Sequence, residues 1–309
     1  MKILLLGAKG QVGDALREVL AEAGDLTCAT RDGKLGNGAA CIAADLSDPQ
    51  SLAAALEHGN PEILVNAAAY TAVDRAEDES DLADRVNHRA VGEIGAWASR
   101  RGATVVHYST DYVFDGRATR PYREQDATGP LGVYGRSKLA GEEALTRSGA
   151  AHLILRTAWV YSTRGHNFLR TILRLADERE ELRIVSDQIG APTPASLIAA
   201  TTATMLAQWR SLGDDQRHDL SGIWHLTAAG QCSWFEFANA IVDEAHSVGV
   251  IARAPRVLPI STADYPTRAR RPAYSVLDCG KLEKAFAVDF PNWRPSLQRS
   301  IAKLAGETS

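Results

Sequence analysis

The stretch Lys2-Ile3-Leu4-Leu5-Leu6-Gly7-Ala8-Lys9-Gly10-Gln11-Val12-Gly13 decides the fold that this chain is expected to adopt. It begins with a short apolar run, which is typical of a strand buried in a parallel sheet. The run ends at Gly7, and apolar residues then recur from Val12 to Leu20 at helical spacing. Gly7, Gly10 and Gly13 suit a tight strand-to-helix turn in which the helix N-terminus binds a diphosphate. The turn therefore predicts a dinucleotide site, although its spacing is G-x-x-G-x-x-G and a turn without ligand is the alternative.

Strand-like and helical segments alternate through the first half of the chain. The strand-like runs are Ile3–Leu6, Leu26–Ala29, Ile63–Asn66, Val105–Ser109 and Leu153–Val160. The helical patterns between them are Gln11–Glu22, Pro49–Glu57, Asp81–Arg101 and Tyr134–Arg147. This alternation predicts an α/β fold with a Rossmann-type, doubly wound parallel sheet, whose ligands lie beyond the C-terminal ends of the strands.

The second half of the chain is less regular and predicts a smaller substrate lobe interleaved with the sheet. Two helices, a short strand and a strand that returns to the main sheet are expected at Asn167–Glu178, Ser233–Glu244, Ile184–Asp187 and Trp224–Leu226. We place the dinucleotide-binding domain at residues 1–165, with 195–229 returning to it, and the substrate lobe at 166–194 and 230–309.

The composition is that of a cytoplasmic globular protein. A net charge of −4 over 309 residues gives no electrostatic reason to expect binding to nucleic acid or to an anionic membrane. No apolar run approaches the length of a membrane span, and the first is too short for a signal peptide. The 4 cysteines lack C-x-x-C spacing and the 8 histidines lack a ligand pattern, so we expect reduced thiols and no metal.

A tyrosine and a lysine one helical turn apart are the main catalytic candidates. Tyr134 and Lys138 would share a helix face, where the ammonium is expected to lower the pKa of the phenol from about 10 toward neutrality. Such a phenol is a general acid for a carbonyl oxygen whose carbon receives a hydride. Thr110 would share that oxygen, with Ser109 as the alternative by strand alternation. Asp111 would hold a substrate hydroxyl or cap the following turn.

Two acidic residues and one arginine are candidates for binding the adenosine part of a dinucleotide. Arg31 and Asp32 lie about twenty residues past the glycines, where the ribose is recognised. Arg31 suits a 2′-phosphate and Asp32 a free 2′-hydroxyl, and we expect NADPH, with NADH possible, because Arg31 comes first after the strand. Asp45, next to Leu46, would accept from the adenine amino group or precede a helix as an ordinary surface residue.

Three further polar positions follow or face the predicted sheet. In Asn66-Ala67-Ala68-Ala69, small residues would let the backbone pass close to the cofactor or would pack tightly on a helix. Asn87 lies among apolar residues, so it is expected either to support Lys138 through water or to make an ordinary interior hydrogen bond. His107 is expected to pack against the sheet.

Taken together, these residues resemble the extended short-chain dehydrogenase/reductase superfamily, and within it the dTDP-4-dehydrorhamnose reductases. The resemblance runs along nearly the whole chain. It is carried by the glycine turn and by the blocks at 66–77, 107–114, 133–142, 156–161, 187–193 and 270–272. The last four blocks are much more specific than the motifs of the superfamily.

The resemblance implies reduction of the C4 keto group of dTDP-4-dehydro-L-rhamnose by NADPH or NADH, the last step of dTDP-rhamnose biosynthesis. It implies Thr110, Tyr134 and Lys138 as the catalytic trio, and a sugar pocket lined by Thr110, Asp111, Tyr134 and Trp159. Together with the residues argued above, the expected cofactor contacts are Gly7, Gly10, Gln11, Val12, Gly13, Arg31, Asp45, Leu46, Ala67, Ala69, Tyr70, Thr71, Tyr108, Tyr134 and Lys138.

The resemblance also bears on metal and partners. Some members of the family dimerise through a magnesium ion held by glutamates, but the corresponding positions here are Ala15 and Ser196. We therefore expect no metal site and a monomer or a weak homodimer. The expected partner is a dTDP-sugar, with no nucleic acid and no membrane.

Other activities of this superfamily remain as alternatives. A nucleotide-sugar 4,6-dehydratase needs an Asp-Glu pair after the threonine, but Asp111 is followed by Tyr112. A 4-epimerase would keep NAD⁺ bound, and a non-catalytic regulatory subunit, like that of methionine adenosyltransferase, would keep only the fold. Finally, Arg268–Arg271 would hold the diphosphate or form a solvated surface.

Overall fold

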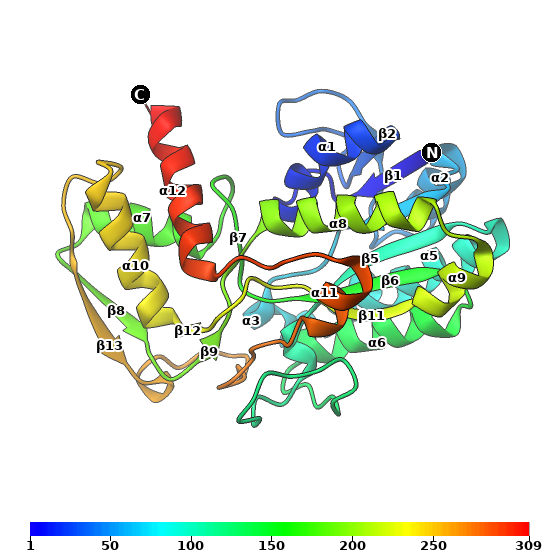
Figure 1. Ribbon diagram of the computed structural model, residues 1–309. Helices are drawn as coiled ribbons and strands as arrows, with labels where there is room; N and C mark the ends of the chain where they lie inside the picture. The colour runs from blue at the N-terminus through cyan, green and yellow to red at the C-terminus, as the bar shows by residue number, and fades with distance from the viewer. Residues whose placement is uncertain (309) are drawn as a thin grey trace.

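A parallel sheet of seven strands, ordered β11-β6-β5-β4-β1-β2-β3, forms the centre of the computed structural model (Figure 1). The structure describes residues 1–308, except for the side chains of residues 214, 307 and 308. The strands are β1 (Lys2–Leu6), β2 (Asp25–Thr30), β3 (Ile42–Ala43), β4 (Ile63–Asn66), β5 (Thr104–Thr110), β6 (His152–Thr157) and β11 (Gly222–His225). The strand order reverses between β1 and β4, which is where doubly wound sheets bind their ligands.

Helices cover both faces of this sheet (Figure 1). One face carries α1 (Gln11–Ala23), α8 (Ala195–Arg210) and α11 (Gly280–Phe286), and the other carries α2 (Pro49–Gly59), α5 (Ala90–Arg101) and α6 (Val133–Arg147). In β1, Ile3 and Leu5 belong to the first core and Leu4 and Leu6 to the second, each at most 1% exposed. This burial on both sides explains why the strand is a continuous apolar run.

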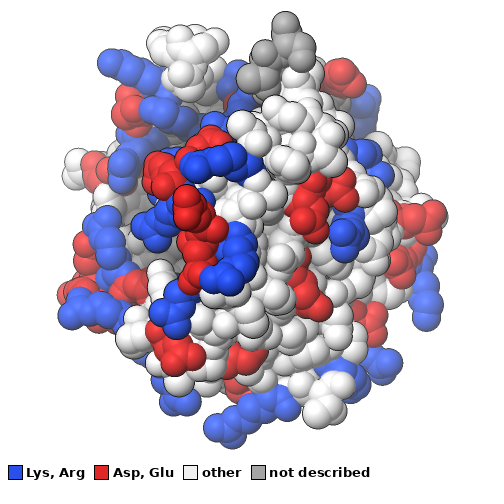
Figure 2. All heavy atoms as spheres, turned by 90° about the vertical axis from the view of Figure 1, so that its left-hand side faces the viewer, with Lys and Arg blue, Asp and Glu red and all other residues white. Residues whose placement is uncertain are grey.

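A smaller layer with its own apolar core lies beside the sheet, on the left of Figure 1. It contains α7 (Phe168–Glu178), α10 (Trp234–Ser247), α12 (Trp293–Thr308) and the parallel pair β8 (Glu181–Val185) and β13 (Arg256–Ile260). Two short pairs, β7 (Val160–Tyr161) with β10 (Thr193–Pro194) and β9 (Ile189–Gly190) with β12 (Cys232–Ser233), connect it to the sheet layer. Acidic and basic side chains are interspersed on its outer face (Figure 2).

The remaining elements are short: α3 (Val73–Ala76), α4 (Ser80–Asp84), a π-helical turn at Arg85–Arg89, a 3₁₀ turn at Asp111–Val113, α9 (Asp214–Leu220) and a second 3₁₀ turn at Thr262–Asp264. No helix within residues 1–308 is both long enough and apolar enough to span a membrane.

The doubly wound sheet is confirmed, and β11 is the returning strand predicted at Trp224–Leu226. Three predicted elements were wrong in detail. The strand predicted at Leu153–Val160 is broken into β6 and β7 because Trp159 has a φ of +47°. The short strand predicted at Ile184–Asp187 lies earlier, as β8, and the long helix predicted at Asp81–Arg101 is α4, the π turn and α5 in succession. The domain boundaries stay a prediction.

Candidate active site

The glycine-rich turn between β1 and α1 is closely packed. Gly7 has a φ of +77°, and a Cβ atom there would lie 2.6 Å from Ala68 N. A Cβ atom on Gly13 would collide with Gly7 O, whereas Gly10, the N-cap of α1, leaves the helix without a side-chain cap. Gln11 Oε1 is buried without a partner among the described residues. The open helix N-terminus, with its free N–H groups, fits a bound diphosphate, whereas Gln11 Oε1 can only accept a hydrogen bond.

The C-terminal end of β2 carries a carboxylate among cations. Asp32 accepts hydrogen bonds from Thr30 Oγ1 at 3.0 Å and Lys34 N at 3.3 Å, and its Oδ2 lies 3.3 Å from Lys9 Nζ. The hydrogen bond from Thr30, followed by that from Lys9, lowers the pKa of Asp32, so this carboxylate is ionised at neutral pH. Arg31 is exposed beside it. The end of β2 therefore carries both Asp32, which suits a ribose 2′-hydroxyl, and Arg31, which suits a 2′-phosphate.

Removing the Asp32 charge is expected to favour NADPH over NADH. The variant Asp32→Asn would no longer repel a 2′-phosphate and would lose an acceptor for a 2′-hydroxyl. The kcat/KM with NADPH divided by the kcat/KM with NADH should therefore rise roughly tenfold. Asp25→Asn, at the opposite end of β2, is the matched control and should leave the ratio unchanged. An unchanged ratio in Asp32→Asn would mean that the carboxylate does not face the ribose.

Asp45 lies in the turn that precedes α2 and binds the serine two residues further on. Its Oδ1 accepts from Ser47 N at 2.8 Å and from Ser47 Oγ at 2.7 Å. The side chains of Val12 and Leu46 contribute to the cores on the two faces of the sheet. The contact of Asp45 with adenine stays a prediction.

Asn87 fixes the backbone that follows β4. Its Oδ1 accepts from Tyr70 N at 2.9 Å, and its Nδ2 donates to Tyr70 O and Ser137 Oγ, each at 3.0 Å. These partners use both amide hydrogens in ordinary interior hydrogen bonds. The predicted support of Lys138 by Asn87 through water stays a prediction. Residues 67–71 remain partly or fully exposed and can face a cofactor.

Thr110 and Tyr134 come together at the C-terminal end of β5. Thr110 Oγ1 donates to Asp111 Oδ1 at 3.0 Å and accepts from Tyr112 N at 3.2 Å, and it is hydrogen-bonded to the Tyr134 phenol. Burial raises the pKa of Tyr134 to about 12. The prediction that Lys138 lowers the pKa of Tyr134 was therefore wrong for this structure, because Lys138 Nζ bonds to other groups.

Lys138 is buried on the α6 side of β5. Its Nζ donates to Tyr108 O at 2.6 Å and lies 3.2 Å from His107 Nε2. Burial lowers the pKa of Lys138 to about 8, although the Glu142 carboxylate opposes the shift. The hydroxyl of Tyr108 pairs with Thr202 on α8 at 2.8 Å, on the other side of the sheet, so near Lys138 Tyr108 offers its carbonyl. The contact between His107 and Lys138 was missed because a sequence does not show which strand residue faces a helix residue.

A buried ion pair lies deeper along the same face. Glu142 accepts from Arg156 Nε at 2.9 Å and from Arg156 Nη2 at 2.6 Å, and both side chains are 2% exposed. Ser109 Oγ also donates to Glu142. The Ser109 hydroxyl is thus hydrogen-bonded to the ion pair, which leaves Thr110 as the hydroxyl beside Tyr134.

Asp111 presents an unpaired oxygen. It is 2% exposed, the hydroxyls of Thr110 and Ser275 are hydrogen-bond donors beside the carboxyl group, and Oδ2 itself is left without a partner at hydrogen-bonding distance among the described residues. Burial raises the pKa of this carboxyl to about 6. An ionised carboxylate at neutral pH with a free oxygen beside Thr110 fits a sugar hydroxyl.

Trp159 is held in a strained conformation by aromatic packing. Its ring stacks on Trp234 with centroids 3.5 Å apart and planes 7° from parallel, while its φ is +47°. Its other neighbour is Gly190, where a Cβ atom would collide with the indole. A half-buried indole fixed in this way fits the predicted wall of a sugar pocket.

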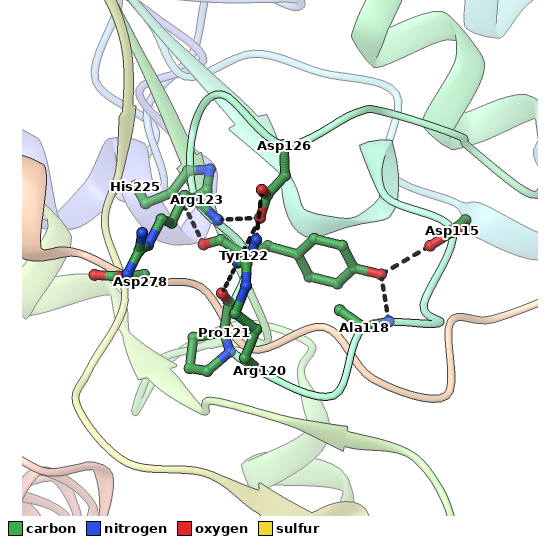
Figure 3. Close-up of polar contacts among 9 residues, drawn as sticks. All are labelled: Asp115, Ala118, Arg120, Pro121, Tyr122, Arg123, Asp126, His225 and Asp278. Carbon is green, nitrogen blue, oxygen red and sulfur yellow. Dashed lines mark hydrogen bonds and ion pairs between the residues drawn. The ribbon is translucent and has the colours of Figure 1, made fainter.

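The loop 115–126 is fixed from within (Figure 3). The Tyr122 hydroxyl donates to Asp115 at 2.8 Å and accepts from Ala118 N at 3.1 Å, and Asp126 accepts from Arg120 at 2.8 Å. His225, on β11, contacts Tyr122 O through Nδ1 at 3.1 Å. The loop is thereby anchored to the edge of the main sheet.

The basic loop near residue 270 pairs with acidic residues of the segment around α3. Arg271 Nη2 donates to Asp74 Oδ2 at 2.7 Å, Asp74 Oδ1 accepts from Ala269 N at 3.1 Å, and Arg268 pairs with Asp78. Both arginines are thus engaged in ion pairs, and a contact with a diphosphate stays a prediction.

Ala15 and Ser196, the positions that would hold a bridging magnesium ion, line one surface hollow together with Asp14 and Glu18. Among the side chains that the structure describes, no group of three or more His, Cys, Asp or Glu is placed to bind a metal ion.

Comparison with known proteins gives one consistent family. A family model described as the RmlD substrate binding domain matches residues 1–305. A dTDP-4-dehydrorhamnose reductase of Burkholderia thailandensis is 48% identical over 312 residues, covering 99% of this chain and 100% of the relative. The Escherichia coli K12 reductase is 41% identical over 309 residues, covering 100% of both chains. The Bacillus anthracis reductase, solved in complex with NADP, is 33% identical with a TM-score of 0.84 over 98% of this chain and 100% of that one.

Proposed function

This chain belongs to the dTDP-4-dehydrorhamnose reductase family, and from that premise we propose that it reduces the C4 keto group of dTDP-4-dehydro-L-rhamnose to give dTDP-L-rhamnose, with NADPH as the reductant. It is an oxidoreductase of dTDP-rhamnose biosynthesis. The observation that carries the proposal is the hydrogen-bonded pair of Thr110 and Tyr134, with Lys138 one turn further along α6.

Tyr134 is proposed as the general acid. Reduction of a ketone requires a protonated donor at the carbonyl oxygen, and a phenol with a pKa of about 12 holds its proton throughout the neutral range. As the C4–O4 bond becomes that of an alkoxide, O4 becomes more basic than the phenolate, and the proton moves from Tyr134 to O4. The hydroxyl of Thr110 stabilises the charge that develops on O4.

The cofactor supplies the hydride when it is bound, and the residues of the turn fit it. Gly10 and the N-terminus of α1 would hold the diphosphate through their backbone N–H groups. The segment 67–71 would line the nicotinamide side, and Lys138 would hold the ribose there. Arg31 and Asp32 would contact the adenosine ribose.

Asp111 is proposed to accept a hydrogen bond from a sugar hydroxyl through Oδ2. Because its pKa is raised to about 6, it is ionised above that pH and loses this acceptor as the pH falls through it. We expect kcat/KM for the sugar to decline below about pH 6. In Asp111→Asn, kcat/KM for the sugar should be roughly 10- to 100-fold lower and should no longer decline below about pH 6, while the KM for NADPH stays unchanged. An acidic limb retained in Asp111→Asn would assign it to another group.

The oligomeric state is proposed from the two positions at which a magnesium ion would be bridged. We propose a monomer or a weak homodimer, because Ala15 and Ser196 carry no carboxylate where magnesium would be bridged. Sedimentation velocity with and without a chelator tests this oligomeric state.

The cysteines among the described residues are free thiols, which supports the proposal that the protein works in the cytoplasm.

The proposed reaction is tested by mixing the protein, NADPH and freshly generated dTDP-4-dehydro-L-rhamnose and following loss of the reduced nicotinamide absorbance. dTDP-glucose, which lacks a keto group, is the substrate control. Oxidation that depends on the keto sugar supports the proposal. Binding of NADPH without oxidation would favour a regulatory subunit or a reductase for another nucleotide sugar.

A further inference from the structure

The ring of His107 connects the neighbouring strand β4 with the lysine of the proposed active site. Asn66 Nδ2 lies 3.1 Å from His107 Nδ1, and His107 Nε2 lies 3.2 Å from Lys138 Nζ. The three side chains are at most 2% exposed, so bulk water does not replace these contacts. Among the described residues, Lys138 Nζ also donates to Tyr108 O, at 2.6 Å.

The partners of Asn66 determine which nitrogen of His107 carries the hydrogen. Ala68 N donates to Asn66 Oδ1 at 3.2 Å, which turns the amide hydrogens on Nδ2 toward His107 Nδ1. Nδ1 must then accept, and a neutral imidazole that accepts at Nδ1 carries its hydrogen on Nε2. Burial, the larger cause, lowers the pKa of His107 well below its ordinary value, so the ring is neutral whether Lys138 is charged or not. The Nε2–H therefore faces Lys138 Nζ.

This arrangement suits an amine better than an ammonium. A neutral Nζ can accept from His107 Nε2–H through its lone pair and still donate to Tyr108 O, whereas an ammonium would place hydrogen against hydrogen. Burial also lowers the pKa of Lys138, to about 8.

Other groups that face Lys138 act in both directions or carry no charge. On α6, the Glu142 carboxylate raises the pKa of Lys138, and Tyr134, one turn earlier, is uncharged. On β6, Arg156 is paired with Glu142. Asn66 on β4 and Asn87 on the π turn are neutral amides.

We infer that His107 is a positioning residue for Lys138: its Nε2–H, oriented by Asn66, holds Nζ against the Tyr108 carbonyl and makes the ammonium less stable relative to the amine than it would be without this imidazole. The inference rests on the proposed function only for the role of Lys138. Lys138 is charged below its pKa and neutral above it, so activity that needs the charged form is lost as the pH rises through that pKa. Because the imidazole disfavours the ammonium, we expect this loss at a lower pH than in an enzyme without His107.

The variant His107→Gln tests this direction. A glutamine can present its amide oxygen to Nζ and accept from an ammonium, so the alkaline limb of kcat/KM should move upward by about one pH unit, with the plateau at lower pH retained within a few-fold. His152→Gln on β6 is the matched control, since its buried ring contacts Ala150 O through Nδ1 at 2.8 Å. Its pH profile should coincide with that of the unaltered enzyme.

A second readout needs neither cofactor nor substrate. Long-range ¹H–¹⁵N spectra of the free protein distinguish the two imidazole tautomers, and the signals missing from His107→Gln identify His107 among the 8 histidines. We expect a neutral ring with its hydrogen on Nε2 between about pH 6 and pH 9.

A hydrogen on Nδ1, or an alkaline limb that stays in place or moves downward in His107→Gln, would overturn the inference. If the variant does not fold, the pH-profile comparison is lost, but labelled spectra of the other single histidine variants still assign His107 by elimination, and its tautomer then decides the inference. If the unaltered protein fails to oxidise NADPH with the keto sugar, the proposed function fails, while the spectra still decide the tautomer.

Discussion

Replacing Tyr134 by phenylalanine is expected to lower kcat by roughly 10²–10⁴. The phenol is the proposed proton donor to O4, and phenylalanine keeps the ring that packs edge-on against Tyr112, with centroids 5.7 Å apart. The loss should therefore fall on turnover, while the Kd of NADPH, measured by fluorescence titration, stays within about twofold. The effect is large because the phenylalanine ring carries no proton that could be given to O4.

Tyr122→Phe is the matched control for this experiment. Its hydroxyl bonds to Asp115 and Ala118 within the loop 115–126 (Figure 3). The partners of Thr110 Oγ1 are different residues, Asp111, Tyr112 and Tyr134. We expect a modest loss of stability, about 1 kcal/mol, and turnover within a few-fold of the unaltered enzyme. Near-normal turnover in Tyr134→Phe would remove Tyr134 from the role of acid.

Replacing Glu142 by glutamine is expected to destabilise the fold by about 3–5 kcal/mol. The substitution leaves the guanidinium of Arg156 buried at 2% exposure without a counter-charge, next to the ring of Phe114 at 5.1 Å. An unpaired buried charge costs far more than a lost surface pair. The free energy of unfolding in urea measures the effect.

The neighbouring residue supplies a close comparison. Glu143 is 56% exposed and pairs with Arg147 at 3.3 Å on the surface of the same helix. Glu143→Gln should change the free energy of unfolding by less than about 0.5 kcal/mol. A similar small change in Glu142→Gln would show that the buried pair is not needed to offset the charge of Arg156.

The sheet was predictable from the chain because its signals are local. The apolar run of β1, the glycines that follow it and the Pro49 that opens α2 after the Asp48 cap each specify their own conformation. Ser233 and Glu236 likewise form a capping box at the start of α10. The break between β6 and β7 was not predictable, because the positive φ of Trp159 results from its packing between Gly190 and Trp234, which lie far away in the sequence.

The candidate site was predictable in its membership and less so in its electrostatics. Tyr134 and Lys138 share a helix, so their spacing alone placed them near each other, and family resemblance added Thr110 and Asp111. The pKa of Tyr134 was wrongly predicted because Lys138 turns to Tyr108 O and His107. Those contacts depend on how β5 is set against α6, and no local pattern encodes that.

The contacts between distant segments were likewise outside the reach of sequence patterns. Arg156 bonds to Glu142 and Arg271 to Asp74 across elements that are far apart in the chain, and an isolated arginine in a sequence does not indicate its partner. For the same reason the loop at residues 268–271 could be described only as basic, with its acidic partners unassigned.

The measurement that most directly tests the proposed reaction follows the hydride itself. The protein is incubated with dTDP-4-dehydro-L-rhamnose and NADPH deuterated at the transferable position, and the sugar product is examined by NMR. We predict one deuterium at C4 of dTDP-L-rhamnose for each NADPH oxidised. A product without deuterium at C4, or no oxidation of NADPH by a folded protein that binds it, would contradict the proposed reduction.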